Sequence, residues 1–223
     1  MKPRIVVGAL VILGLGSQAA LGVCGPPAAR TLAVTDSARI YAQPAARGAP
    51  VKIVGCRLES GGVPIPLATQ LTRNVRAGTR TVVQRIIVQV PRINGPFAAI
   101  AVRNFDTLGR GRTTIRVTDL RTGAPVFSSR QTTGTLGRAR DWNVTDLVVS
   151  TDGRGAWITV YRRAPSQSQV WIHTFTGDSS IDSGLIDPFS LEVVETPNET
   201  GGIDAGINYT KQGGTEPGNS SLT

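Results

Sequence analysis

The stretch 144–184 constrains the fold of this 223-residue chain more than any other part of the sequence. It contains four short segments in which apolar and polar residues alternate, a pattern typical of half-buried strands. These segments are 146–150, 156–161, 169–175 and 179–183. The turns Thr151-Asp152-Gly153 and Thr176-Gly177-Asp178 have the composition of hairpin connections. The stretch therefore predicts one small antiparallel sheet of four strands.

A second stretch, 81–130, repeats the same order of strand, turn, strand, longer polar loop, strand, Gly turn and strand. Two incomplete copies flank these units. Residues 188–195 and 203–210 match the first two strands, and residues 38–67 match the last two. Residues 61–67 contain Pro64 and Pro66 and are expected to form an edge strand or an extended loop, and residues 75–80 are expected to form a polar connector. Because no helical periodicity is sustained beyond residue 22, we expect an all-β protein.

Two motifs resemble bacterial β-propeller repeats of the WD40 and TolB type. The first is IRVTDLRTG at 115–123, similar to a hairpin between the last two strands of a blade. The second is VTDLVVSTDG at 144–153, similar to the opening of TolB-type blades, with Thr151 where that pattern has Pro. The Gly-His and Trp-Asp pairs of WD40 repeats are absent. The resemblance extends over residues 80–210, and it includes uncharacterised exported propeller-like proteins of GC-rich actinobacteria.

This resemblance implies about three four-stranded antiparallel propeller-like blades. One blade would be composite, with residues 188–210 supplying its first two strands and residues 38–67 its last two. Because closed propellers have about four to eight blades, an open array and a homodimer are alternatives. The strand positions expected in the core are Val148, Ile158 and Ile172, with Trp157 and Trp171 packed between blades.

Residues 1–22 have the features of a signal peptide. Lys2 and Arg4 precede an apolar segment, 5–15, that is too short for a comfortable membrane span. We expect cleavage after Gly22, with cleavage after Ala19 and an uncleaved anchor as alternatives. The domain would then occupy 23–210, followed by a disordered Gly- and Ser-rich tail at 211–223. These features predict a secreted or cell-envelope protein.

Cys24 and Cys56 are the two cysteines of the chain. In an oxidising compartment an even pair predicts one disulfide. The sequence before Cys24 also resembles a bacterial lipobox, but Val23 stands where that pattern has a small residue, so lipidation is the alternative. Two thiols and the single histidine, His173, are too few ligands for a closed tetrahedral metal site. We therefore expect no metal.

The sequence shows no catalytic constellation. His173 lies inside a predicted strand without a nucleophile motif to accompany it, and no phosphate-binding loop occurs. The four aspartates considered as paired acids are expected to satisfy backbone donors in turns. They are Asp119, Asp146, Asp152 and Asp187. We accordingly expect neither an enzyme nor a cofactor.

The net charge of +9 comes almost entirely from arginine. Selection for binding a polyanion and codon bias in a GC-rich genome both explain this excess. In the predicted blades, the longer connectors 105–112, 131–143 and 162–168 share one face, and the tight turns share the other. The connectors hold six arginines: Arg110, Arg112, Arg138, Arg140, Arg162 and Arg163. The turns hold three: Arg92, Arg121 and Arg154.

These arginines predict a non-enzymatic extracytoplasmic binding or scaffold module. Its partner would be an anionic envelope polymer or an acidic protein, which the connector face would dock. The other explanation of these side chains is that they are solvated residues of polar loops. A hydrolase or ligand sensor with its site in the propeller funnel is the alternative function. We expect no nucleic-acid partner, because export separates the protein from it.

Overall fold

The computed structural model describes residues 24–59, 62–105, 111–132, 142–164, 167–175, 190–200, 202–210 and 217–221. These residues form fourteen strands in three antiparallel sheets and contain no helix, so the predicted all-β, antiparallel class is confirmed. The described part of the chain accordingly has no helix suited to crossing a membrane. The predicted signal peptide, 1–22, lies outside the described residues.

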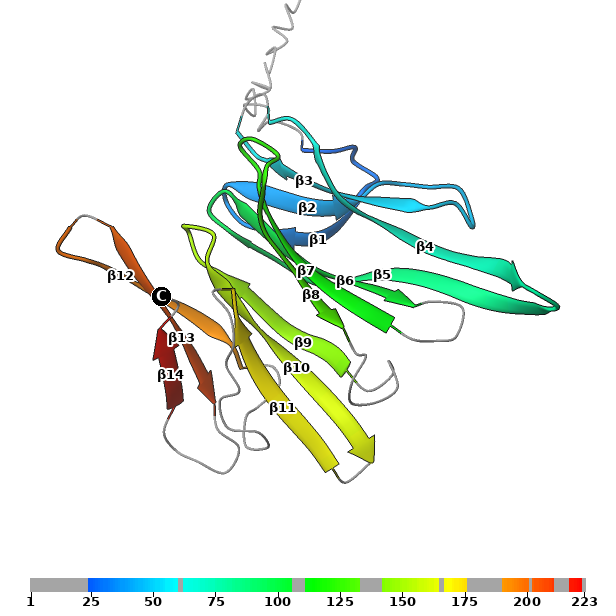
Figure 1. The fold of residues 1–223 in the computed structure, drawn as a ribbon. Helices are drawn as coiled ribbons and strands as arrows, with labels where there is room; N and C mark the ends of the chain where they lie inside the picture. The colour runs from blue at the N-terminus through cyan, green and yellow to red at the C-terminus, as the bar shows by residue number, and fades with distance from the viewer. Residues whose placement is uncertain are drawn as a thin grey trace, which may run out of the picture.

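The first sheet has eight strands that follow one another in chain order. They are β1 (Arg30–Val34), β2 (Ala38–Ala42), β3 (Val51–Arg57), β4 (Ile65–Ala77), β5 (Arg80–Asn94), β6 (Phe97–Phe105), β7 (Gly111–Asp119) and β8 (Pro125–Thr132). The sheet is strongly curved, so that β1–β3 lie over one face of β5 and β6 (Figure 1). The four strands expected at 81–130 are therefore present as β5–β8.

The long hairpin of β4 and β5 differs from the prediction. Residues 65–67 were expected at an edge or in a loop, and 75–80 as a connector, but β4 pairs with β3 up to Gln70 and with β5 from Leu71 onward. Pro66 is accommodated opposite Val54, where the register shifts at a bulge. The two-residue turn at Gly78, which has φ +62°, forces β5 to pair beside β4. This hairpin joins two expected units into one sheet.

Two three-stranded sheets follow. The second sheet consists of β9 (Trp142–Val149), β10 (Gly155–Ala164) and β11 (Gln167–Thr174), with β10 in the centre. The third consists of β12 (Glu192–Pro197), β13 (Ile203–Thr210) and β14 (Pro217–Ser221), with β13 in the centre. The fourth strand expected at 179–183 lies outside the described residues. Residues 217–221, expected in a disordered tail, form β14.

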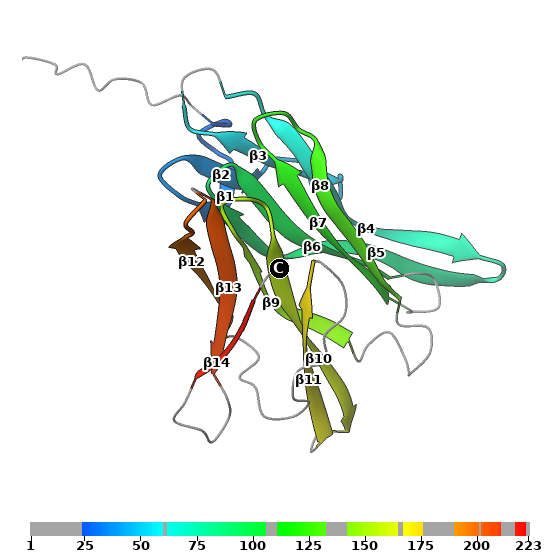
Figure 2. The same cartoon turned by 60° about the vertical axis from the view of Figure 1, so that its left-hand side comes forward.

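The sheets are stacked in layers with β6 near the middle (Figures 1 and 2). Ile100 packs toward β1–β3, whereas Ala99 and Ala101 pack toward β9 and β10, where Leu147 and Trp157 lie. Because both of its faces are covered, β6 is apolar without alternation and is buried from Phe97 to Arg103. The packing of Trp157 between sheets agrees with the prediction.

A third core lies between the second and third sheets. Val148, Ile158 and Ile172, which were predicted core positions, are buried there against Ile207 of β13. The side chain of Trp171 lies outside the described part of the chain. Alternation of apolar and polar residues along these strands therefore predicted correctly that Val148, Ile158 and Ile172 are buried.

The structure does not show the predicted blade arrangement or a closed propeller. The described strands form sheets of eight, three and three, rather than blades of four. The predicted composite blade is also absent among the described strands, because β12 and β13 pair with each other and with β14 instead of β2 and β3. The physical reason is that a repeat of strand lengths does not specify which strands pair. The short turn at Gly78 does specify it, because it pairs β4 with β5 and so joins the first two expected units.

Cys24 and Cys56 form the predicted disulfide, with their Cα atoms 5.8 Å apart. The bridge is buried beside Tyr41 in a small apolar cluster. Arg39 reinforces this region, because its guanidinium donates hydrogen bonds to the carbonyl oxygens of Cys24 (3.1 Å) and Ala29 (2.8 Å). The disulfide thus attaches the segment before β1 to β3.

Candidate anion-binding groove

The ends of six strands lie along one side of the molecule. β6, β8 and β10 end there, and β7, β9 and β11 begin there (Figure 1). Of the six predicted site arginines, Arg112 is described with its side chain, which is exposed on β7. Arg162 and Arg163 lie near the end of β10 on this side, with their side chains outside the described residues. Arg110, Arg138 and Arg140 lie entirely outside the described residues.

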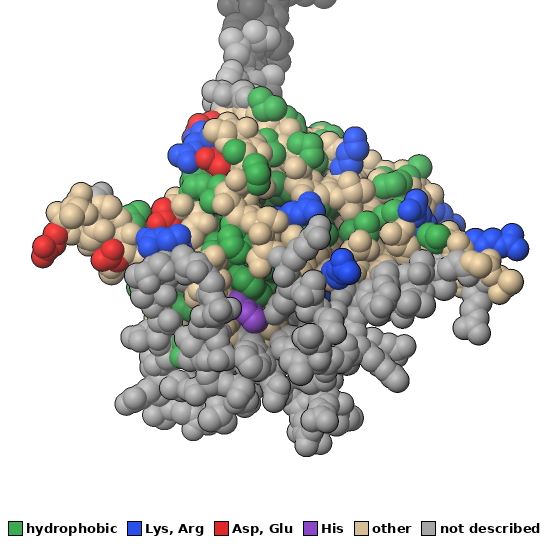
Figure 3. Space-filling view, viewed as in Figure 1, with side chains coloured by type: hydrophobic (Ala, Val, Ile, Leu, Met, Phe, Trp, Pro, Cys, Tyr) green, Lys and Arg blue, Asp and Glu red, His purple; other side chains and the backbone are tan. Residues whose placement is uncertain are grey.

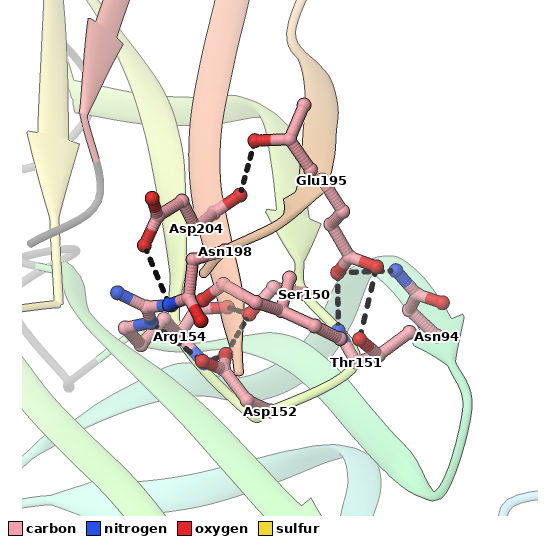
Figure 4. A network of polar contacts seen from close by, with 10 residues as sticks. Asn94, Ser150, Thr151, Asp152, Arg154, Glu195, Asn198 and Asp204 are labelled. Atoms are coloured by element: carbon pink, nitrogen blue, oxygen red, sulfur yellow. Dashed lines mark hydrogen bonds and ion pairs between the residues drawn. The ribbon is translucent and has the colours of Figure 1, made fainter. Parts of the chain in front are cut away.

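The tight turns on the opposite side form a polar network that attaches the third sheet to the other two (Figure 4). The carboxylate of Glu195 on β12 accepts hydrogen bonds from the hydroxyl of Thr151 (2.9 Å) and from the amide of Asn94 (3.4 Å). Arg154 donates to the carboxylate of Asp152 and to the carbonyl of Ile203, both at 2.7 Å. These polar groups are therefore engaged in holding the sheets together.

Two of the four aspartates have the predicted turn roles. Asp119 accepts hydrogen bonds from the backbone N–H (2.8 Å) and the guanidinium (2.7 Å) of Arg121, and these hydrogen bonds lower the pKa of Asp119. Burial acts to raise the pKa of Asp152, but hydrogen bonds from Ser150 and Arg154 outweigh it, so this pKa is also lowered. Both carboxylates are stabilised in their charged form.

Asp146 differs from its predicted role, because it lies within β9 rather than in a turn, and Asp187 lies outside the described residues. Only 4% of Asp146 is exposed, and its carboxylate forms an ion pair with Arg92 of β5 (2.9 Å). It also accepts hydrogen bonds from the backbone N–H groups of Leu147 (2.9 Å) and Leu191 (3.1 Å). Asp146 therefore connects β5, β9 and the segment before β12.

His173 is part of an aromatic cluster on the second sheet. Its ring stacks on Trp157 with 4.9 Å between centroids, and its Nε2 lies 2.8 Å from the hydroxyl of Thr159. Phe127 of β8 and Phe175 complete the cluster. Within the described residues, no three His, Cys, Asp or Glu side chains are grouped so that they could hold a metal.

A groove with a cavity volume of about 360 Å³ lies over β4–β7. It is lined by apolar side chains, by two arginines and by uncharged polar side chains that are able to donate and accept hydrogen bonds. The apolar residues are Ala68, Ile86 and Val102, and the polar residues are Thr69, Asn104, Arg112, Thr114 and Arg116. No carboxylate lines this groove.

The alternation of β7 places its two arginines in the groove. Arg112, Thr114 and Arg116 share one face, opposite Asn104, Val102 and Ile100 of β6. The other face carries Ile115 and Val117, which are buried against the second sheet. Four residues along a strand separate the Cα atoms of Arg112 and Arg116 by about 13 Å. Both side chains are exposed, and neither has a hydrogen-bond or ion-pair partner among the described residues.

The groove lies in the basic half of the chain. Residues 65–132 contain eleven arginines and two aspartates, whereas residues 176–223 contain eight carboxylates and one lysine. In Figure 3, the right-hand part of the surface, which includes β4 and β5, shows Lys and Arg side chains without acidic ones, whereas acidic side chains lie over the region of β12 and over the N-terminal strands at the upper left. The prediction assigned binding to the connectors and so missed Arg116, which lies within a strand. A count of charged residues along the chain would have identified β4–β8 as the basic region.

Comparison with known proteins finds no family model, no curated protein and no solved structure that matches this chain.

Proposed function

We propose that this protein is a non-enzymatic, extracytoplasmic binding module that docks an anionic partner in the groove of Arg112 and Arg116. The observation that carries the proposal is the presence of two exposed guanidinium groups, without partners among the described residues, in a concave site that no carboxylate lines. An arginine without a counter-ion retains its capacity for bidentate hydrogen bonds to phosphate or carboxylate.

The rest of the groove supports the same class of ligand. Asn104, Thr69 and Thr114 provide neutral donors and acceptors around the two charges. The apolar lining lowers the local dielectric constant, which strengthens attraction between a guanidinium and an anion. The proposal requires neither the propeller blades suggested by the repeat pattern nor a closed ring.

The disulfide supports the extracytoplasmic location, because such bridges persist in oxidising compartments. It also favours a secreted protein over one that is lipid-anchored at Cys24. A lipid at this residue requires the same sulfur atom that bonds to Cys56. Export through the predicted signal peptide, 1–22, would place the groove where anionic envelope polymers and acidic proteins occur.

The proposal is tested by titrating the mature protein with labelled polygalacturonate and labelled polyphosphate at two salt concentrations. The test variant is R112S/R116S. The matched control is R47S/R76S, which removes two exposed arginines that do not line this groove.

Loss of two charge-assisted contacts should weaken binding by about tenfold or more in the test variant. The control should lose less than about threefold, and added salt should weaken all binding as screening shortens to about 8 Å at physiological ionic strength. Equal losses in the two variants would show that net charge alone attracts the polyanion, and would refute a specific groove.

A further inference from the structure

The hairpin of β4 and β5 extends beyond the body of the molecule as a two-stranded arm, residues 71–84 (Figures 1 and 2). β3 pairs with β4 up to Gln70, and β6 pairs with β5 from Arg85 onward. Among the described strands, residues 71–77 of β4 therefore have β5 as their one neighbour. The backbone N–H and C=O groups that point away from β5 are open to a further strand. We call residues 71–77 the open edge.

The arm has little apolar packing of its own. Val83 exposes 54% of its surface, and Val75 is half-buried. Arg73 donates a hydrogen bond to the amide oxygen of Gln84 (2.8 Å), which ties the two strands together. A hairpin of two strands is marginally stable in water, and three or more strands are needed for independent stability. A further strand at the open edge would therefore stabilise the arm.

A cavity of about 510 Å³ borders the open edge where the pairing of β3 with β4 ends. It is lined by residues 70–72 of β4 and by residues 42–44, 48, 49 and 51 around the turn that precedes β3. Most of the residues that line it are apolar, and none is acidic. A strand that continues the line of β3 along the open edge would bring its carboxyl end next to Val51. An apolar side chain at that end would be buried in this cavity.

The charge of the arm determines which strand fits. The arm carries Arg73, Arg76 and Arg80, and residues 60–105 include no aspartate or glutamate. Arg73 and Arg76 are exposed, and because they are three positions apart on one strand they lie on opposite faces of the arm. The arm of a second copy would bring like charges together, which disfavours pairing of two arms. An acidic strand would instead place opposite charges across from both arginines.

We infer that the open edge accepts an extended acidic segment of a partner protein, which adds to the sheet antiparallel to β4. Backbone hydrogen bonds supply the affinity in this mode of recognition, and side-chain pairs and pockets supply the specificity. The site is separate from the groove of Arg112 and Arg116, because residues 71–77 do not line that groove. The inference therefore goes beyond the proposed function and does not depend on it.

The test uses labelled peptides as long as the open edge and the mature protein at physiological ionic strength. The acidic peptide consists of valine and threonine with two glutamates three positions apart, the spacing of Arg73 and Arg76. A second peptide has lysine in place of both glutamates. A third keeps the glutamates but has methyl groups on alternate backbone nitrogen atoms, which removes strand pairing and leaves the charge unchanged.

Three protein variants accompany the wild type: R73S/R76S, the charge reversal R73E/R76E, and the matched control R112S/R116S, which removes two exposed arginines outside the arm. Thermal melting of each variant checks that the fold is retained. Binding is followed by fluorescence anisotropy, and hydrogen exchange of the backbone amides of residues 71–77 is measured with and without peptide.

We expect wild type and R112S/R116S to bind the acidic peptide equally, with slower exchange along the open edge. R73S/R76S should bind it about fivefold more weakly or worse. R73E/R76E should lose the acidic peptide and bind the lysine peptide, because the reversed charges restore the cross-strand pairs. The methylated peptide should not bind, because it cannot complete the hydrogen bonds of a strand.

The inference is overturned if the methylated peptide binds as tightly as the acidic one, since charge alone would then attract it. It is also overturned if no peptide slows exchange in residues 71–77. If the protein without peptide is a dimer in which these residues are already protected, the occupant is a second copy and not an acidic partner. None of these outcomes bears on the groove, which the titration with polygalacturonate and polyphosphate tests separately.

Discussion

Removal of the Cys24–Cys56 disulfide should lower the stability of the domain by an amount that can be worked out from its position. The bridged residues are 32 positions apart in the sequence. Closing a loop of this length in the unfolded chain restricts its entropy by an amount worth about 3.7 kcal/mol at 25 °C. For a domain of this size, such a loss lowers the melting temperature by roughly 7 to 15 °C.

The assay compares oxidised and reduced mature protein in guanidinium chloride, with tryptophan fluorescence as the readout. Reduction leaves the buried sulfur atoms in place and thus isolates the effect of the covalent bond. The variant C24A/C56A also loses sulfur packing beside Tyr41, so its stability should fall below that of reduced wild type. Arg39 still holds the carbonyl oxygens of Cys24 and Ala29 in both cases.

A difference below about 1 kcal/mol between the oxidised and reduced forms would refute this reasoning. Such a result would mean that residues 24–56 remain restricted in the unfolded chain without the bridge. A lower midpoint with a steeper dependence on denaturant is the expected outcome, because the unfolded chain without the bridge is less compact and exposes more surface.

Three further predictions concern the sheets. Asp146→Ala should cost about 2–4 kcal/mol in denaturant unfolding, because it leaves Arg92 and two backbone N–H groups without their acceptor, and Asp146→Asn should cost less; equal costs would contradict this role. Ile100→Ala should cost about 2–5 kcal/mol in the same assay, and a loss below 1 kcal/mol would show that β6 is not central to the core. Because Arg121 lowers the pKa of Asp119, this pair stabilises the fold above the unfolded pKa of about 3.9, and its contribution is lost as the pH falls through the folded value. The melting temperature of wild type should therefore fall more steeply below pH 4 than that of Asp119→Asn, and parallel curves would count against it.

The basic groove could be predicted from the sequence only in part. Arg112 was identified because it lies in the Gly- and Arg-rich connector expected at 105–112, whereas the structure places it on β7. Arg116 was missed because the argument assigned function to connectors, although alternation along β7 places it on the same face as Arg112.

The sequence by itself determined most strand positions, the core residues predicted from alternation and the disulfide. Alternation is a property of a few consecutive residues, so it places Ile158 and Ile172 in a core without knowledge of the partner sheet. The tertiary structure alone decided which strands pair and which charges meet. The short turn at Gly78 joined two repeat units into one sheet, and the packing of β9 against β5 brought Asp146 to Arg92. Such contacts depend on burial and chain connectivity over long separations, which local periodicity does not encode.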